Sequence, residues 1–456
     1  MGLRLDWEIE SEQQVVRQAT GEDPETRRQR RRRRFLILLI PLILLAIIGV
    51  VVGAVALRLR EVDAEVEKVL VDTVDAEIAT LRIGDEQAFM NFQRSASDAW
   101  QETQSQAFDA YQTLKLDSSI QLTGQIIDTV VDGSRARVQV QEIIDGTPYI
   151  RTWFYWRYED GWRHVPPDYT FWGEGQRRES GTVTVYYQAV DDSLARITAE
   201  TVANWLQTGC DSLGCETVPT LRVQIVADPG FKTDWSPDDP WLLRMRSPYT
   251  QLARMDAPFD FSLQFEVANL VAERLVSVAS NDLQPVYPAD VFYLRSSIVS
   301  WLVGRFVSIN TNAFLIGSLA QHYGEAAVGL LLQALEPESD ASVLNGVTGA
   351  ATLAEANLDW RDFLTWRLAL EDELIQRGDE GSFLALYDTR DETVRALAYD
   401  RYNRGTLAGS RVVVSVTPET TPAGFRQLRA QAQIGSTEQS DAVVFRLMNE
   451  HWLRAN

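Results

Sequence analysis

The sequence predicts a multidomain α+β protein with one N-terminal transmembrane helix. Three observations support this fold class. The chain has 456 residues, enough for two or three ordinary domains. An uncharged apolar run extends from Phe35 to Leu57. After this run, helix-like stretches and strand-like runs follow one another in separate blocks, an order typical of α+β domains.

The apolar run predicts a membrane span. At about 1.5 Å per helical residue it covers about 34 Å, which crosses a bilayer. It exceeds the h-region of a cleaved signal peptide, about 7–15 residues, and soluble cores rarely need so long an uncharged helix. The tract RRQRRRRR, Arg27 to Arg34, precedes it directly. Basic residues stay on the cytoplasmic side, so we expect residues 1–34 to form a cytoplasmic, largely disordered tail of a single-pass cell-membrane protein.

The net charge of the chain limits the kinds of molecule that can bind it. The formal net charge is −21, although residues 1–60 carry more basic than acidic side chains, so the part after the span is the acidic part. An acidic ectodomain repels nucleic acid and anionic headgroups. We assign the arginine tract to topology and lipid contact, and we expect no nucleic-acid partner. The expected partner is an extracytoplasmic protein or a small ligand of unknown identity.

The stretch after the span predicts a helix. Leu59, Val62, Val66 and Val69 recur at three- and four-residue spacing. Two interpretations fit this pattern. The helix forms a short parallel coiled coil and a homodimer, or it is the first helix of a globular domain, which the decay of the pattern after two heptads favours.

Residues 58–176 predict the first α+β domain. A helical stretch over 85–115 is followed by strand-like runs that are separated by the hairpin signals Asp132-Gly133, Asp145-Gly146 and Asp160-Gly161. The last runs, TWFYWRYE and WRHVPPDYTFWG, are rich in aromatic residues.

This element order, with its closing aromatic strands, resembles the nuclear-transport-factor-2-like, or SnoaL-like, cone over about Asp63 to Gly173. The resemblance implies a curved antiparallel sheet that wraps around helices and leaves a pocket at its open end. The candidate pocket residues are Trp156, Trp162, His164 and Tyr169. The alternative is that these side chains pack the sheet.

The middle region, residues 177–370, opens with a strand, a helix and a second strand before a mostly helical stretch. Cys210 and Cys215 lie in the loop-like sequence TGCDSLGC. In an oxidising exterior these two cysteines predict a small-loop disulfide. A zinc site would need two more soft ligands nearby, and the sequence offers none.

The run FSLQFEVANLVAERLV, from Phe261, resembles the active-site helix of the peptidase-MA-like gluzincin metallopeptidases. In that family His-Glu-x-x-His holds zinc with two imidazoles and supplies a general base. Here Phe265 and Asn269 stand at the two ligand positions, and Glu266 stands at the base position. The later run SSIVSWLVGRF has Val303 where the family has its third ligand, a glutamate.

Zinc hydrolysis needs three protein ligands to hold the metal and to lower the pKa of bound water to about 7. Phenylalanine and valine cannot coordinate, so the resemblance implies an inactivated peptidase with no metal and no cofactor. The i, i+3 spacing of His322 and Glu325 could place both on one helix face, but an ordinary helix end is the favoured interpretation over a metal site.

Residues 371–456 predict a second, smaller α+β domain of the same kind. The segment from Arg377, RGDEGSFLALYDTRDETVRALAYDRYNRG, repeats the spacing of the segment from Ile83, IGDEQAFMNFQRSASDAWQETQSQAFDAYQTL. Three strand-like runs follow it, which predicts a second cone. Chance similarity of two amphipathic helices is the alternative.

The sequence thus favours a membrane-anchored, extracytoplasmic, non-catalytic binding protein. Two alternatives stay open. One is a metal-independent hydrolase or isomerase that uses acidic residues such as Glu266 or Asp168. The other is a structural scaffold that dimerises through the helix after the span.

Overall fold

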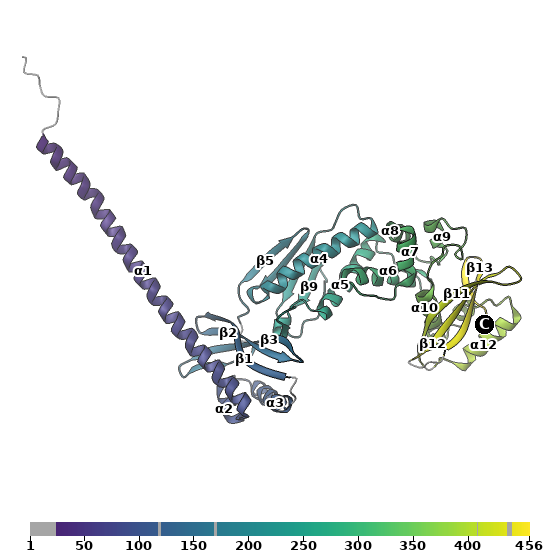
Figure 1. Cartoon of the computed structure of the whole chain (residues 1–456), viewed down its shortest axis with the longest axis horizontal. Helices are drawn as coiled ribbons and strands as arrows, with labels where there is room; N and C mark the ends of the chain where they lie inside the picture. Colours follow the sequence, from purple (N-terminus) through teal and green to yellow (C-terminus); the bar gives the residue numbers. More distant parts are fainter. Residues whose placement is uncertain (1–23, 117–119, 168–170, 408, 436–439) are drawn as a thin grey trace, which may run out of the picture. The chain divides into compact units, whose positions relative to one another are not determined.

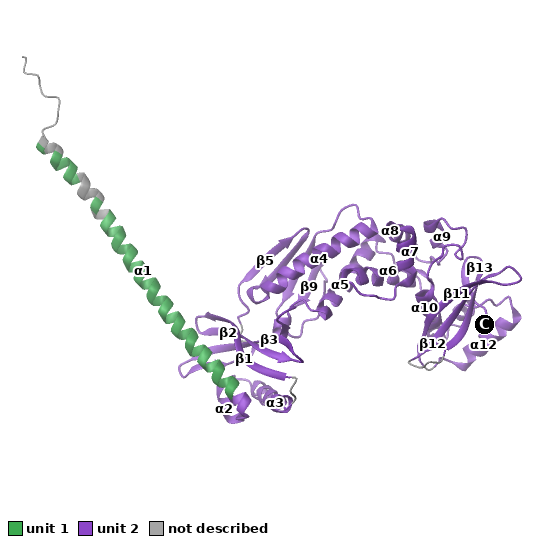
Figure 2. Ribbon diagram, viewed as in Figure 1, with its two compact units in different colours: residues 1–79 green, residues 80–456 purple. Residues whose placement is uncertain are grey.

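The computed structural model describes residues 24–116, 120–167, 171–407, 409–435 and 440–456. The chain divides into two compact units, residues 1–79 and 80–456 (Figure 2). Tyr169 and Asp168, two of the residues singled out above, lie outside the described residues, as do residues 1–23 of the expected tail.

The first unit contains most of one long helix, α1 (Pro24–Ile83), which runs without interruption for 60 residues (Figure 1). The expected membrane span and the helix expected after it are therefore parts of one element, and residues 24–34 are helical as well. Among the described residues this is the one helix long and apolar enough to cross a membrane. Past the apolar run, Leu59, Val62 and Val69 are exposed.

The first α+β region spans residues 86–164. Its two helices, α2 (Glu86–Phe92) and α3 (Asp98–Leu114), replace the single helical stretch that the sequence predicted. The chain leaves the helix at Gln93, which forms a parallel β-bridge with His164, and it re-enters after Ser97. The expected meander follows as β1 (Ile120–Asp132), β2 (Arg135–Ile144), β3 (Thr147–Tyr158) and β4 (Gly161–His164).

The three expected hairpins are present in this meander. The turn between β2 and β3 has positive φ at both Asp145 (50°) and Gly146 (75°). Tight hairpins require such angles at both central residues, and aspartate followed by glycine adopts them at little cost.

The middle region contains a mixed sheet in the order β5-β6-β7-β9-β8, in which β6, β7 and β9 are parallel. Helix α4 (Asp192–Leu213) connects β6 to β7 and buries its apolar face against the sheet. The short strand β10 (Ala253–Arg254) leaves this region and pairs with β3 of the first region. The sheet strands are β5 (Gly175–Ser180), β6 (Val183–Gln188), β7 (Leu221–Val226), β8 (Asp234–Ser236) and β9 (Asp239–Arg246).

A group of helices follows the mixed sheet and shares its core. Their buried residues, together with those of α4 and of the last sheet, form one continuous hydrophobic cluster. The helices are α5 (Phe261–Ala279), α6 (Val291–Phe306), α7 (Phe314–Tyr323), α8 (Ala326–Ala334), α9 (Val343–Thr348) and α10 (Arg361–Arg377).

The last α+β region spans residues 380–454 and repeats the order of the first. Helices α11 (Glu380–Ala385) and α12 (Glu392–Arg404) precede a four-stranded antiparallel meander, one strand more than the sequence predicted. The turn before each pair of helices is also repeated: Gly84-Asp85 precedes α2, and Gly378-Asp379 precedes α11. The strands are β11 (Arg411–Thr420), β12 (Arg426–Ile434), β13 (Ser440–Met448) and β14 (His451–Arg454).

Candidate functional site

The residues that the peptidase resemblance singled out lie on two helices. Asp260 caps α5 by accepting a hydrogen bond from the Leu263 backbone N–H (2.9 Å), which fixes where the helix begins. Phe265 is 39% exposed, and its ring lies 6.1 Å from that of Phe261. Asn269 donates to the Phe265 carbonyl oxygen (2.7 Å), so its amide serves its own helix.

The other two positions have equally ordinary surroundings. Glu266 lies 3.7 Å from the guanidinium of Arg246 and is partly exposed. Val303, on α6, is 1% exposed and belongs to the core. The set therefore combines a surface phenylalanine, a helix-bonded amide, an ion-paired carboxylate and a core valine, which is not a set of zinc ligands.

The rest of the described chain holds no cluster of metal-binding side chains either. Across the described residues, no three His, Cys, Asp or Glu side chains lie close enough together to hold a metal ion. Glu325, paired with His322 in the sequence, instead contacts Arg305 and accepts a hydrogen bond from Ser212 (3.0 Å). The hydrogen bond from Arg305 holds the pKa of Glu325 below its ordinary value. The carboxylate of Glu325 is therefore already paired with the guanidinium of Arg305.

The aromatic candidates of the first region divide between the two faces of the sheet. Tyr155 pairs with His164 and Trp156 pairs with Arg163, so Trp156 lies on the face opposite to His164 and Trp162. Trp162 is 1% exposed. Because side chains alternate between the two faces of a strand, the separation of Trp156 from His164 and Trp162 could have been predicted from the sequence.

His164 is packed among aromatic rings. Its ring centroid lies 5.5 Å from that of Trp100, 5.3 Å from that of Trp153 and 5.1 Å from that of Tyr155. Both His164 and Trp162 are buried, so they are part of the packing between the sheet and its helices. Of the two interpretations of these residues, this burial favours packing.

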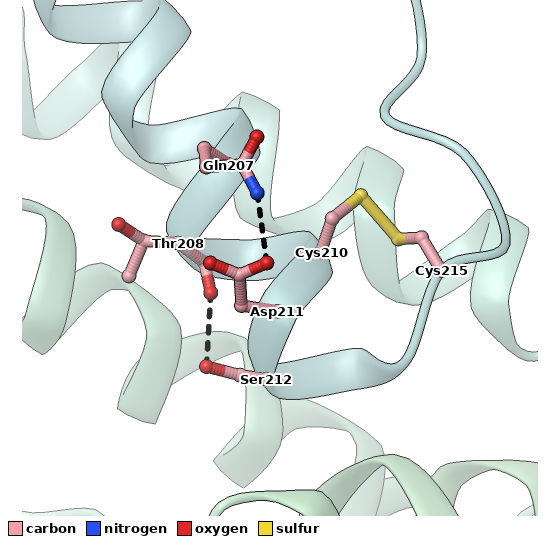
Figure 3. The surroundings of a disulfide bond; sticks show 6 residues. All are labelled: Gln207, Thr208, Cys210, Asp211, Ser212 and Cys215. Atoms are coloured by element: carbon pink, nitrogen blue, oxygen red, sulfur yellow. Dashed lines mark hydrogen bonds between the residues drawn. A yellow bond between two sulfur atoms is a disulfide. The ribbon is translucent and has the colours of Figure 1, made fainter.

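Cys210 and Cys215 are joined by a disulfide at the end of α4 (Figure 3). The helix ends at Gly214, which has a left-handed φ of 72°. The backbone N–H groups of Gly214 and Cys215 both donate to the Cys210 carbonyl oxygen, at 2.9 and 3.1 Å. The disulfide therefore closes a turn that the backbone already makes.

A buried carboxylic acid lies just before α4. Asp191 is fully buried, and one of its oxygens accepts a hydrogen bond from the Ser247 hydroxyl (2.5 Å). Its second oxygen has no hydrogen-bond partner among the residues that the structure describes. Burial raises the pKa of Asp191 to about 7, although the Ser247 hydrogen bond and the charge of Arg137 act in the opposite direction.

A cavity of about 730 Å³ lies between the loop before α10 and the hairpin of β11 and β12; we call it the carboxyl-terminal groove. The groove is lined by both polar and aromatic residues. Asn357 and Arg426 at its rim are exposed, and Trp360 and Trp452 at its base are buried. Its lining residues are Ala354, Asn357, Leu358, Asp359, Trp360, Arg361, Val414, Ser415, Val416, Pro418, Glu419, Thr420, Arg426, Gln427, Leu428 and Trp452.

Trp452 lies at the base of this groove. The residue is 2% exposed, and its ring meets that of Trp360 edge to face at 5.7 Å. Its indole Nε1 is buried and finds no hydrogen-bond acceptor within the described part of the chain. The two rings therefore give the groove a packed aromatic base.

A charged pair continues the groove. Arg361 donates from both Nε and Nη2 to the Asp359 carboxylate, and its guanidinium lies over the ring of Phe314 at 3.7 Å. The hydrogen bond to Asp359 raises the pKa of the guanidinium. The same two residues line a second hollow of about 460 Å³ beside α6 and α7. The two hollows therefore meet at the Asp359–Arg361 pair.

The groove was not among the sites predicted from the sequence, because its two sides are about 60 positions apart in the chain. One signal was available: Pro418 interrupts the strand-like run RVVVSVTPE, and proline within a strand marks a sheet edge. No protein-family model matches the chain, and a search of curated proteins found no match either.

Proposed function

We propose that this chain is a membrane-anchored, extracytoplasmic, non-catalytic protein that binds its ligand in the carboxyl-terminal groove. The observation that carries this proposal is the groove itself: an open concavity of about 730 Å³ with buried tryptophans at its base and exposed polar groups at its rim. The apolar part of α1 supports the membrane anchor, and Arg27 to Arg34 before it support a cytoplasmic N-terminus.

The middle region, on this proposal, is an inactivated gluzincin-like module, and the two α+β regions are cones that arose by duplication. Their repeated order of helices and strands supports the duplication. The residues at the former ligand positions support inactivation, because Phe265 and Val303 cannot coordinate zinc. Stoichiometric zinc in the purified full-length protein would contradict the non-catalytic assignment.

Site-specific photocrosslinking tests the groove as the binding site. A photoreactive amino acid replaces Asn357 at the rim in the full-length protein, in its native membrane. The matched control replaces Tyr399, an exposed residue of α12 that does not line the groove. We expect a specific adduct from position 357 and none from position 399. Equal labelling at both positions, or none at either, would refute the proposed site.

A second candidate function, a homodimeric scaffold, is favoured by one observation. Leu59, Val62 and Val69 occupy a and d positions of a heptad pattern and are exposed on α1. Light scattering of the full-length protein in nanodiscs would give twice the protomer mass for such a dimer. Val62→Glu would then restore the monomer, whereas Glu67→Lys, at an exposed b position on the outer face of the helix, would leave the dimer intact.

A further inference from the structure

One side of the carboxyl-terminal groove is the edge strand of a sheet. The last sheet has the order β11-β12-β13-β14, so β11 pairs with a neighbour on one side only. Such a strand presents unpaired N–H and C=O groups to anything that lies beside it. The following argument rests on the proposed function, since it concerns what occupies the groove.

The direction of each backbone group of β11 follows from two observations. The Val413 N–H donates to the Thr365 hydroxyl of α10 (2.9 Å), so it points away from β12. A bulge after Val413 shifts the register by one residue, and Ser415 then pairs with Gln431. Since outward and inward residues alternate in an antiparallel pair, Val416, Pro418 and Thr420 point their backbone groups outward.

Pro418 supports this assignment independently. Proline has no N–H, and within a sheet it is accommodated where that group would face away from the neighbouring strand. We call Val416, Pro418 and Thr420 the open edge of β11. It offers three carbonyl acceptors and two N–H donors, and all three residues line the groove.

We propose that the groove takes an extended polypeptide segment of a partner protein, which pairs with the open edge as a fifth strand. Pockets for small ligands are mostly enclosed and apolar. Here the two tryptophans are buried, and the rim consists of exposed polar residues such as Asn357 and Arg426. From Val414 to Thr420 the strand extends about 23 Å at about 3.3 Å per residue, which matches a segment of about seven residues.

The side chains beside the open edge indicate what the segment carries. Val416, Thr420 and Leu428 lie on one face of the last sheet. Arg426, which is exposed, lies on the same face. Alternate side chains of the segment that face Arg426 are therefore acceptors, such as aspartate, glutamate or their amides.

The test uses a displayed library of random decapeptides, selected on the full-length protein in nanodiscs. Selected peptides are resynthesised with a single N-methyl group at each position in turn. Strand pairing predicts that binding weakens about tenfold at alternate positions, where an N–H donates to an open-edge carbonyl, and changes little at the positions between. Peptides that bind elsewhere, or that show no alternation, would overturn the proposal.

Two variants separate backbone from side-chain effects. Val416→Pro removes one outward N–H without removing a hydrogen bond to β12, whereas Val416→Ala keeps that N–H. We expect the proline variant to bind peptide about tenfold more weakly than the alanine variant, because both lose the valine side chain but only proline loses the N–H. Thermal unfolding of the two variants checks that both are folded. Equal binding by both variants would count against strand pairing. If no peptide is selected while position 357 still crosslinks a partner, the strand proposal fails and the binding function stands; if both experiments fail, both are refuted.

Discussion

The first and last α+β regions share a plan but differ at one equivalent position. In each, two short helices precede a four-stranded meander, and the residues after the first helix form a parallel β-bridge with the end of the fourth strand. The bridge joins Gln93 to His164 in the first region and Tyr387 to Arg454 in the last. The repeat also includes the end of the preceding helix, because Glu77 and Glu371 lie at the same distance before the two Gly-Asp turns and both are buried.

The surroundings of the bridged residues are chemically opposite. His164 lies among the rings of Trp100, Trp153 and Tyr155. Arg454 instead donates to both oxygens of Glu371, at 2.7 and 2.6 Å, and Arg411 contacts the same carboxylate (3.0 Å). One backbone arrangement thus accommodates either aromatic packing or a buried ionic cluster, so the topology alone does not determine how the helix–sheet junction is stabilised.

The largest expected effect concerns this ionic cluster. Glu371→Gln would leave the guanidinium of Arg454 without its side-chain carboxylate and that of Arg411 with Asp372 alone, and would lower the free energy of unfolding of the last region by about 3–5 kcal/mol. Hydrogen exchange of peptides from each region measures this loss locally. Glu373→Gln is the matched control, since its pair with Arg377 is exposed and contributes about 0–1 kcal/mol. Equal effects would show that the cluster does not stabilise the region.

Asp191 is buried like Glu371, but its one hydrogen bond among the described residues comes from a hydroxyl, that of Ser247. The folded-state pKa of Asp191, about 7, exceeds its ordinary value of 3.8, so the folded protein holds this proton more tightly. Its contribution to stability is complete below about pH 4 and is lost as the pH rises to 7, about 4 kcal/mol in all. Asp191→Asn should remove this dependence. Unfolding of both proteins between pH 4 and 8 measures it, and parallel profiles would contradict the assignment.

A smaller effect tests whether the two regions are locally equivalent. Asp85 caps α2 by accepting from the Ala88 N–H (2.9 Å), and Asp379 caps α11 by accepting from the Ser382 N–H (3.0 Å). Asp85→Ala should lower the free energy of unfolding of the first region by about 1 kcal/mol, and Asp379→Ala should destabilise the last region in the same direction. An effect in one region alone would mean that the caps are not equivalent.

The smallest effect is expected at the groove. Glu419 accepts from Arg429 and Gln427 on the surface of the last sheet, and the hydrogen bond from Arg429 lowers its pKa. Because this carboxylate is partly exposed and its ion pair lies at the surface, Glu419→Gln should leave hydrogen exchange of the last region almost unchanged. A clear destabilisation would show that surface ion pairs, and not the Glu371 cluster alone, stabilise the last region.

Local sequence signals predicted much of the fold. The Asp-Gly pairs predicted the hairpins of the first region because their preferred angles suit tight turns, and the apolar run predicted the long helix. The break between α2 and α3 could not be predicted from the apolar pattern, since it depends on the backbone pairing of Gln93 with His164, 71 positions later. The sequence also contained the repeat, through the spacing after Ile83 and Arg377.

The candidate sites were less predictable, and for a physical reason. Strand alternation separates Trp156 from Trp162 and His164, but burial, which only the fold determines, distinguishes a pocket wall from a packed core. The groove depends on the approach of the loop before α10 to β11, and no local pattern encodes that approach. Asp191 has an ordinary sequence context, and its raised pKa arises from complete burial.

The oxidation state of Cys210 and Cys215, at the end of α4, reports the side of the membrane on which the region after α1 lies. The chain has two cysteines, and both are used in the Cys210–Cys215 bond. If the region after α1 is exported, the denatured protein reacts with a thiol reagent only after reduction. If that region stays in a reducing cytosol, two thiols react at once. Mass spectrometry of the alkylated chain can therefore determine the side of the membrane without a fusion or a protease.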